Sequence, residues 1–179
     1  MNRIKLSSLL VVFSFIFMSC GGGDTSSSST TNETPETVTT TPPVTETPAA
    51  ADADGVVELT LEGNDQMQFN LKELRVKEGQ TVRLTLNHVG TMAKNAMGHN
   101  FVLLKEGVDL ADFGQKAATA MENDYIPASE EGNIIAHTKM LGGGESDTIE
   151  FEAPAKGTYE FLCSFPGHYA LMRGVFIVE

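Results

Sequence analysis

Apolar and polar residues alternate along much of the chain after residue 55. In residues 81–88, Val82, Leu84 and Leu86 alternate with polar residues, a period-2 pattern that buries one face of a strand and exposes the other. Similar segments, bounded by turn residues, predict strands at residues 56–61, 66–71, 81–88, 99–104, 133–138, 147–152, 157–163 and 174–179. Strands this short and closely spaced predict an all-β fold, an antiparallel sandwich or barrel.

Residues 109–121 are the one segment that favours a helix. They contain the alanine-rich stretch ADFGQKAATAM, although Gly114 weakens a helix. We therefore expect one short helical flap on the β-sandwich or barrel.

The N-terminal segment is typical of an export signal. Residues 9–18 form an apolar run that is too short for a membrane span, which needs about 20 residues. Ser19 and Cys20 follow directly and resemble a bacterial lipoprotein cleavage box, although Phe17 stands where leucine is usual. We expect residues 1–19 to be a lipoprotein signal peptide and Cys20 to carry lipid; a plain signal peptide cut near Ser19 is the alternative.

A polar linker follows. Residues 21–55 are largely Gly, Ser, Thr, Pro and acidic residues, so we expect the segment 20–55 to be a disordered tether before a single folded domain at 56–179. The protein would be exported and membrane-anchored, facing the periplasm or the cell exterior. Lipidation of Cys20 would leave Cys163 without an intramolecular partner; the alternative, a disulfide between them, would tie the tail to the end of a strand.

The chain is acidic, with a formal net charge of −12. Residues 56–179 contain 18 acidic and 10 basic residues. Nucleic-acid binding needs clustered Lys and Arg, so we expect no nucleic-acid partner. The acidic surface would favour basic partner surfaces, or would serve solubility alone.

Three residues with metal-binding side chains lie close together near the C-terminus. Cys163, His168 and Met172 have the spacing Cys-x4-His-x3-Met, on a loop between two predicted strands. One loop does not complete a rigid metal site, and His99, which follows Gly98 at the start of a predicted strand, is the candidate from elsewhere. Each residue alone has a structural interpretation: a methionine fills cores, a cysteine is a small apolar group, and a strand histidine forms hydrogen bonds.

Together, two histidines, one cysteine and one methionine are the ligand set of a blue-copper electron-transfer site. The thiolate donates strongly to copper, two imidazoles complete a trigonal plane, and a weak axial thioether tunes the reduction potential.

Four segments of the chain resemble the azurin family of cupredoxins, in the right order. They are EGNDQMQFN (62–70), KNAMGHNFVL (94–103), IAHTK (135–139) and CSFPGHYALMRG (163–174). The resemblance covers essentially all of 56–179 and implies a Greek-key β-sandwich, the cupredoxin fold. Together with the N-terminal signal and tether, the chain is similar to the lipid-modified azurins of bacterial outer membranes.

The resemblance implies roles for individual residues around one copper ion. The equatorial ligands would be His99, Cys163 and His168, with Met172 as weak axial ligand and the carbonyl of Gly98 opposite.

The same resemblance implies residues that surround the ligands. Backbone N–H groups of Asn100 and Phe165 would bond the cysteine sulfur. His88 would lie near the metal without binding it, and His137 would be a surface histidine. An apolar docking patch for partners would comprise Met97, Phe165, Pro166, Gly167 and Ala170.

The chain also departs from the azurin pattern. The usual disulfide is absent, because Gly79 and the region around Val57 lie where its cysteines would be; we expect a loss of roughly 2–4 kcal/mol unless it is offset elsewhere. Phe101 replaces a buried tryptophan, and Tyr169 is bulkier than usual beside His168, which would narrow the choice of partners.

The function that follows is electron transport by a mobile one-electron carrier, not an enzyme. Its partners would be redox proteins such as c-type cytochromes or terminal reductases and oxidases. Multicopper enzymes need more histidines than this chain has, and a Cys/His hydrolase would need an oxyanion-hole motif that is not evident. A copper-binding or delivery module without an electron-carrier role is the alternative.

Overall fold

The computed structural model describes residues 55–179. The predicted signal peptide at 1–19, the lipidation site Cys20 and all but the last residue of the tether at 20–55 lie outside these residues. Within the described part of the chain, no helix is long and apolar enough to cross a membrane.

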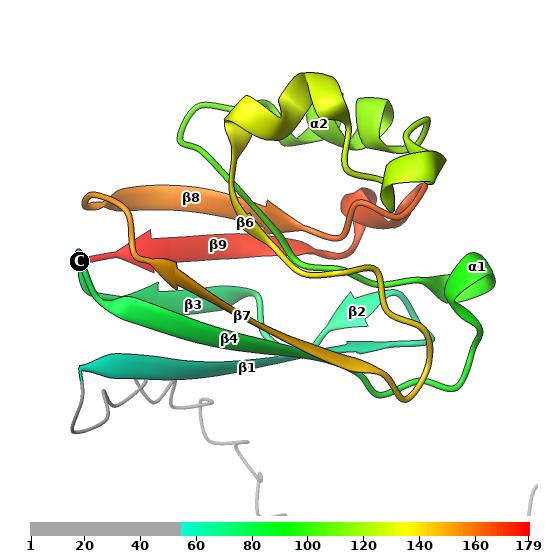
Figure 1. Ribbon diagram of the computed structural model, residues 1–179, viewed down its shortest axis with the longest axis horizontal. Coiled ribbons are helices and arrows are strands. Elements are labelled where there is room, and N and C mark those ends of the chain that lie inside the picture. The colour runs from blue at the N-terminus through cyan, green and yellow to red at the C-terminus, as the bar shows by residue number, and fades with distance from the viewer. Residues whose placement is uncertain (1–54) are drawn as a thin grey trace, which may run out of the picture. The chain divides into compact units, whose positions relative to one another are not determined.

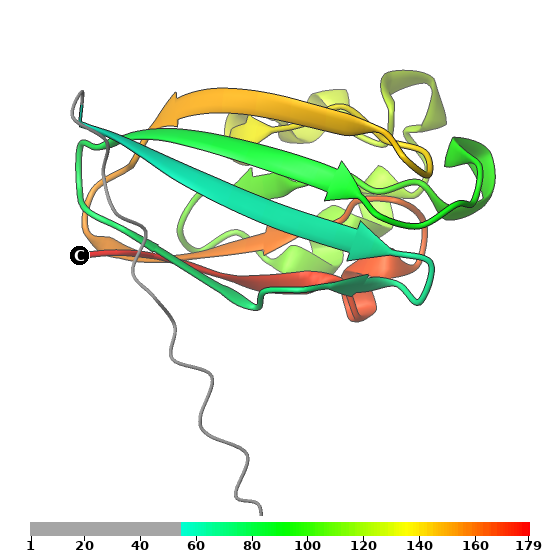
Figure 2. The ribbon, with the colours of Figure 1, turned by 90° about the horizontal axis from the view of Figure 1, so that it is seen from below.

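Two sheets face each other, with β8 and β9 in one layer and β1 and β4 in the other (Figures 1 and 2). The first sheet has the order β2–β1–β4–β7, formed by Val56–Asn64 (β1), Gln68–Phe69 (β2), Thr81–His88 (β4) and Ser146–Glu152 (β7). The second has the order β3–β9–β8–β5–β6, formed by Glu73–Val76 (β3), Val102–Leu104 (β5), Ile134–His137 (β6), Gly157–Leu162 (β8) and Arg173–Val178 (β9). This arrangement confirms the predicted β-sandwich.

The helices are short. They are the α-helices Lys94–Met97 (α1) and Leu110–Ala117 (α2) and the 3-10 helices Met121–Asn123 (η1), Ala128–Asn133 (η2) and His168–Ala170 (η3). The predicted flap at 109–121 is therefore confirmed as α2, which begins where the carboxylate of Asp109 accepts the backbone N–H groups of Ala111 and Asp112, both at 2.9 Å.

Four details differ from the sequence-based prediction. The strand expected at 99–104 begins only at Val102, and the one expected at 66–71 shrinks to two residues. The strand β3 was not predicted. Two strand pairs, β1 with β4 and β3 with β9, are parallel, so the sandwich is mixed and not purely antiparallel. The reason is that the chain leaves the first sheet after β2, adds β3 to the second sheet and then returns to β4.

The core lies between the sheets, and a second apolar layer lies under α2. Strand β4 follows its predicted alternation, with Val82, Leu84 and Leu86 fully buried. Strand β5 is buried on both faces: Leu103 packs in the core between the sheets, whereas Val102 packs in a second cluster with Phe113 of α2. The helix therefore covers the outer face of the second sheet (Figure 1).

The sandwich has two ends, at which strands begin or end and loops connect them. Strand β1 begins, and β9 ends, at the side of the domain opposite α1 (Figure 1). The loops on the α1 side include the Cys163–Met172 segment with its turn η3.

Candidate metal centre

The loop between β8 and β9 is closed by its own backbone hydrogen bonds. The N–H of Cys163 donates to the carbonyl of Met172 at 2.9 Å, and the N–H of Met172 donates to that of His168 at 2.7 Å. Gly167 has a φ of 81°, a left-handed conformation that glycine adopts without strain. The SFPG turn thus brings Cys163 and His168 to the same side of the loop.

His99 reaches the site from another part of the chain. It lies between α1 and β5, where its backbone exchanges hydrogen bonds of 3.0 and 2.8 Å with Leu141. Its side chain is fully buried, as is that of Cys163, and His168 is 3% exposed.

The predicted donor atoms converge. The sulfur of Cys163 lies 3.9 Å from Nδ1 of His99 and 3.7 Å from Nδ1 of His168. All three atoms lie within 4.8 Å of one another. An ion with thiolate and imidazole bonds of about 2.3 and 2.0 Å in a trigonal plane would hold sulfur and nitrogen about 3.7 Å apart. The spacing and the chemistry of the donors therefore fit one bound ion.

Met172 and Gly98 also lie at this site, as predicted. A Cβ on Gly63 would lie 2.9 Å from Cδ2 of His99 and 3.3 Å from Cε of Met172, so both side chains pack against the same glycine. The carbonyl oxygen of Gly98 lies 3.7 Å from the sulfur of Cys163.

Hydrogen bonds fix which nitrogen of His99 is free. Its Nε2 lies 2.8 Å from the backbone carbonyl of Asn64. A carbonyl only accepts, so Nε2 carries the proton and Nδ1 keeps its lone pair for the ion. Sequence reasoning missed Asn64, because a backbone carbonyl leaves no signal in residue type.

His88 lies beside the site and outside the donor set. Its ring stacks on that of His99, with centroids 4.2 Å apart. Its Nε2 contacts the carbonyl of Met97 at 2.7 Å, and its Nδ1 accepts the N–H of Gly90 at 3.1 Å. Both ring nitrogens therefore have partners already.

The electrostatics of the site reflect its burial. Burial raises the pKa of the Cys163 thiol to about 12, and the backbone N–H groups of Asn100 and Phe165 donate to the sulfur and oppose that rise. Burial, followed by repulsion from His99, lowers the pKa of His168 to about 4. Both imidazoles are thus neutral near pH 7 and able to bind a cation.

The predicted docking patch is mostly accessible. Met97 and Pro166 are half-buried, Gly167 and Ala170 are exposed, and Phe165 is buried. Leu171 was missed, although its side chain is 56% exposed next to Ala170.

Tyr169 packs sideways onto the helix α2. A Cβ on Gly114 would lie 2.5 Å from two atoms of its ring, so the ring lies directly over that glycine. The residue after His168 is therefore held against the second apolar layer.

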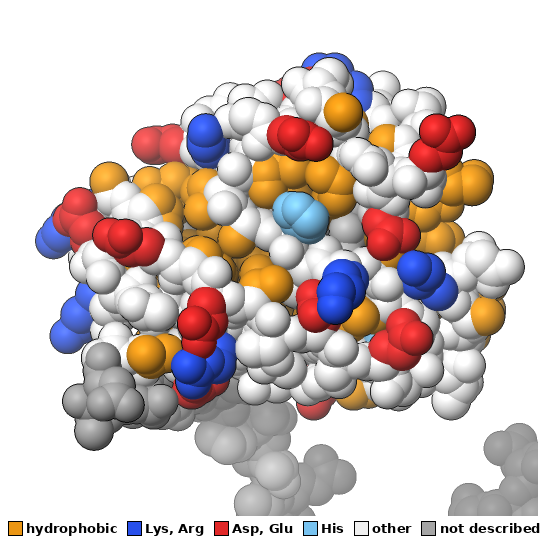
Figure 3. Space-filling model, viewed as in Figure 1, with side chains coloured by type: hydrophobic (Ala, Val, Ile, Leu, Met, Phe, Trp, Pro, Cys, Tyr) orange, Lys and Arg blue, Asp and Glu red, His pale blue; other side chains and the backbone are white. Residues whose placement is uncertain are grey.

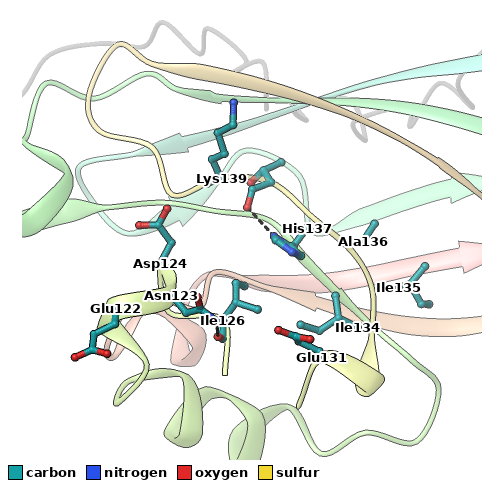
Figure 4. Close-up of a pocket in the computed structure, with 11 residues that line it drawn as sticks. Glu122, Asn123, Asp124, Ile126, Glu131, Ile134, Ile135, Ala136, His137 and Lys139 are labelled. Atoms are coloured by element: carbon teal, nitrogen blue, oxygen red, sulfur yellow. Dashed lines mark hydrogen bonds between the residues drawn. The ribbon is translucent and has the colours of Figure 1, made fainter. Parts of the chain in front are cut away.

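His137 lies at the surface, as predicted, in a hollow of about 690 Å³ (Figure 4). Figure 3 shows a histidine side chain at the surface beside hydrophobic side chains. The hollow is lined by β6 and by the segment around η1, including Asp124 and Ile126. None of the three predicted donors lines it, so it is separate from the metal centre.

Comparison with known proteins agrees with this geometry. Residues 55–179 match a family described as copper binding proteins, plastocyanin/azurin family. Azurin-2 of Alcaligenes xylosoxydans xylosoxydans is 45% identical over 121 residues, which cover 65% of this chain and 93% of that protein. Outer membrane protein H.8 of Neisseria gonorrhoeae is 41% identical over 119 residues, which cover 64% of this chain and 63% of that protein.

Solved structures show the same relationship. Reduced auracyanin from Roseiflexus castenholzii matches with a TM-score of 0.62 and 41% identity, over 68% of this chain and 96% of auracyanin. The cofactor of the matching family is copper, and the buried Cys–His–His cluster fits a single ion. The chain therefore belongs to the plastocyanin/azurin family of copper-binding proteins, whose members carry electrons.

Proposed function

We propose that residues 56–179 form a type 1 copper domain that carries single electrons between redox proteins. His99, Cys163 and His168 would hold the copper, and the thioether of Met172 and the carbonyl of Gly98 would be further, weak contacts. The observation that supports this most is the convergence of three buried donor atoms, one from each of His99, Cys163 and His168. Copper bound there supplies a one-electron couple between Cu(I) and Cu(II).

The protein's contribution is to hold the donors still. The imidazole of His99 is fixed between the carbonyl of Asn64 and the ring of His88. Backbone hydrogen bonds within the loop fix Cys163 and His168. Donors that keep one arrangement in both oxidation states require little reorganisation, which favours rapid electron transfer.

We infer that partners dock at the α1 end of the domain. The ring of His168 is 3% exposed and lies 4.6 Å from the ring of Phe165, which belongs to the apolar patch of Met97, Phe165, Pro166, Gly167 and Ala170. This supports docking of partners at that patch. An apolar surface around a redox centre excludes water and allows close approach. Redox proteins such as c-type cytochromes or terminal reductases and oxidases suit this role.

The membrane anchor is a separate part of the proposal. Residues 1–19 serve as signal peptide, Cys20 carries lipid and residues 20–55 act as tether. A relative is named an outer membrane protein, which supports a membrane location. The folded domain begins at the end opposite α1 (Figure 1).

Copper titration tests the proposed function. Cu(II) added to the protein should give an intense blue charge-transfer band and a narrow hyperfine splitting in the EPR spectrum. Cys163→Ser should abolish the band, because the thiolate supplies the charge-transfer transition. A colourless tetragonal Cu(II) spectrum from the unmodified protein would contradict the electron-carrier role and favour a delivery module.

A further inference from the structure

The turn between β1 and β2 lies against the back of the metal centre. Gly63 leaves space for the side chains of His99 and Met172, and the carbonyl of Asn64 receives the Nε2–H of His99. The side chain of Asn64 closes the turn, because it accepts the N–H groups of Gln66 and Gln68 at 3.0 and 3.2 Å. The orientation of the imidazole therefore depends on where this turn is held.

Asp65, the next residue, fastens the turn to the segment before α1. Its carboxylate accepts the N–H of Thr91 at 2.8 Å, the hydroxyl of Thr91 at 3.2 Å and the N–H of Met92 at 3.3 Å. A Cβ on Gly90 would lie 2.0 Å from Oδ1 of Asp65, so only glycine fits beneath the carboxylate. The N–H of Thr91 is the largest cause that lowers the pKa of Asp65, so the group is ionised near neutral pH.

The segment that Asp65 holds is itself anchored elsewhere. The carbonyl of Met92 accepts the N–H of Gly143 at 2.8 Å, and the carbonyl of His88 accepts the N–H of Gly144, also at 2.8 Å. The pairing of β1 with β4, which ends at Gly63 and His88, also ties this segment to the turn, as does the N–H of Val89, which donates to the carbonyl of Gly63 at 2.9 Å. The carboxylate of Asp65 therefore adds three side-chain hydrogen bonds to the link between the turn and the segment before α1.

We propose that Asp65 is a positioning residue for His99: its carboxylate fixes the turn whose Asn64 carbonyl orients the imidazole. It acts through Asn64 and does not touch the metal. This inference rests on the proposed role of His99 as a copper ligand.

The test measures how well the Nε2–H of His99 is protected. In the Cu(I)-loaded protein, which is diamagnetic, the exchange of that proton with water can be followed by ¹⁵N-edited NMR. Asp65→Ala should accelerate exchange about tenfold or more, because a lost hydrogen bond typically changes a local equilibrium by about that factor. Asp65→Asn keeps one acceptor oxygen and should give an intermediate rate.

Asp109→Ala is the matched control. Asp109 also accepts two backbone N–H groups, but only within its own helix α2, so its loss should leave the exchange at His99 unchanged. The EPR hyperfine splitting of the Cu(II) form should change in Asp65→Ala and stay constant in Asp109→Ala.

Equal exchange rates in the Asp65 and Asp109 variants would overturn the inference, and if Asp65→Ala does not fold, the same comparison is made with Asp65→Asn. If the unmodified protein binds no copper, the proposed function fails. The exchange rates of the copper-free variants then still decide whether Asp65 orients the ring.

Discussion

Asn100 and Ser164 are fully buried, and both the nitrogen and the oxygen of the Asn100 side-chain amide form hydrogen bonds with Ser164. The Nδ2 of Asn100 donates to Oγ of Ser164 at 2.8 Å, and the backbone N–H of Ser164 donates to Oδ1 of Asn100, also at 2.8 Å. Each residue directly follows one of the donors, His99 or Cys163. The pair therefore joins the two chain segments that must stay together for the metal centre to form.

Loss of the asparagine amide should destabilise the copper-free protein strongly. Asn100→Ala leaves the N–H of Ser164 buried without a partner, which should cost about 2 kcal/mol or more in the free energy of unfolding. Ser164→Ala keeps that N–H bonded and leaves only the Nδ2 group of Asn100 without its partner, so it should cost less, about 1–2 kcal/mol. Urea unfolding measures both.

Thr85→Ala is the control for this pair, since the hydrogen bond between Thr85 and Thr148 lies on the solvent side of the first sheet. Its cost should be within about 0.5 kcal/mol. An Asn100→Ala protein no less stable than Ser164→Ala would show that the amide does not join the two segments.

The copper-free protein should lose stability as the pH falls below about 6.5. Burial lowers the pKa of His168 from 6.5 to about 4. Between these two pH values the imidazole of His168 is therefore protonated in the unfolded chain and neutral in the folded chain. Stability is complete above the unfolded pKa and declines between the two values, by up to about 3 kcal/mol. Urea midpoints between pH 7.5 and 5 measure the slope, and His168→Gln should reduce it, with a remainder from His99, whose pKa burial also lowers. An unchanged slope in that variant would assign the pH dependence to other groups.

The alternation of apolar residues predicted which face of each strand is buried. It did not predict which other strand each strand pairs with. Strand β4 spans the predicted residues 81–88 and buries the predicted side chains. Its parallel partner β1 could not be foreseen, because period 2 carries no information on direction. Strand β3, Glu73–Val76, is too short to produce a clear pattern of its own.

The site was predictable where residue type decides the chemistry. The spacing of Cys163, His168 and Met172 pointed to one loop, and the structure brings His99 to it. The carbonyl of Asn64 was not predictable, since every residue has one. Gly63 was not predictable either, because its lack of a side chain matters only once His99 lies beside it.

Replacement of Cys20 by alanine should release the protein from membranes. Cys20 is the proposed lipid attachment site, and the described domain has no helix that could cross a membrane in its place. Fractionation of cells that express each variant measures the membrane-bound share. Cys163→Ser is the control and should remain with the membranes, because it changes only the metal centre. Retention of Cys20→Ala in the membrane fraction would reject the lipid anchor.

Gly114 and Tyr169 should be energetically coupled. Whether Gly114→Ala stabilises or destabilises the protein should depend on whether the tyrosine ring is present at position 169. Alanine in a helix is normally about 0.5–1 kcal/mol more stable than glycine. Here its Cβ would lie 2.5 Å from the ring of Tyr169, so Gly114→Ala should destabilise the protein by about 1–3 kcal/mol. In a Tyr169→Ser background the ring is gone, and the same substitution should be stabilising.

A double-mutant cycle of unfolding free energies measures this coupling between α2 and the metal-binding loop. Gly132→Ala, where a Cβ would meet no atom within 4 Å, is the matched control and should differ little between the two backgrounds. Because Tyr169 follows His168, displacement of the ring by Gly114→Ala should also shift the blue band of the copper-loaded protein. If the unfolding free energies of the two substitutions are additive and the blue band is unchanged, the ring of Tyr169 moves aside without cost. In that case α2 does not fix the position of the metal-binding loop.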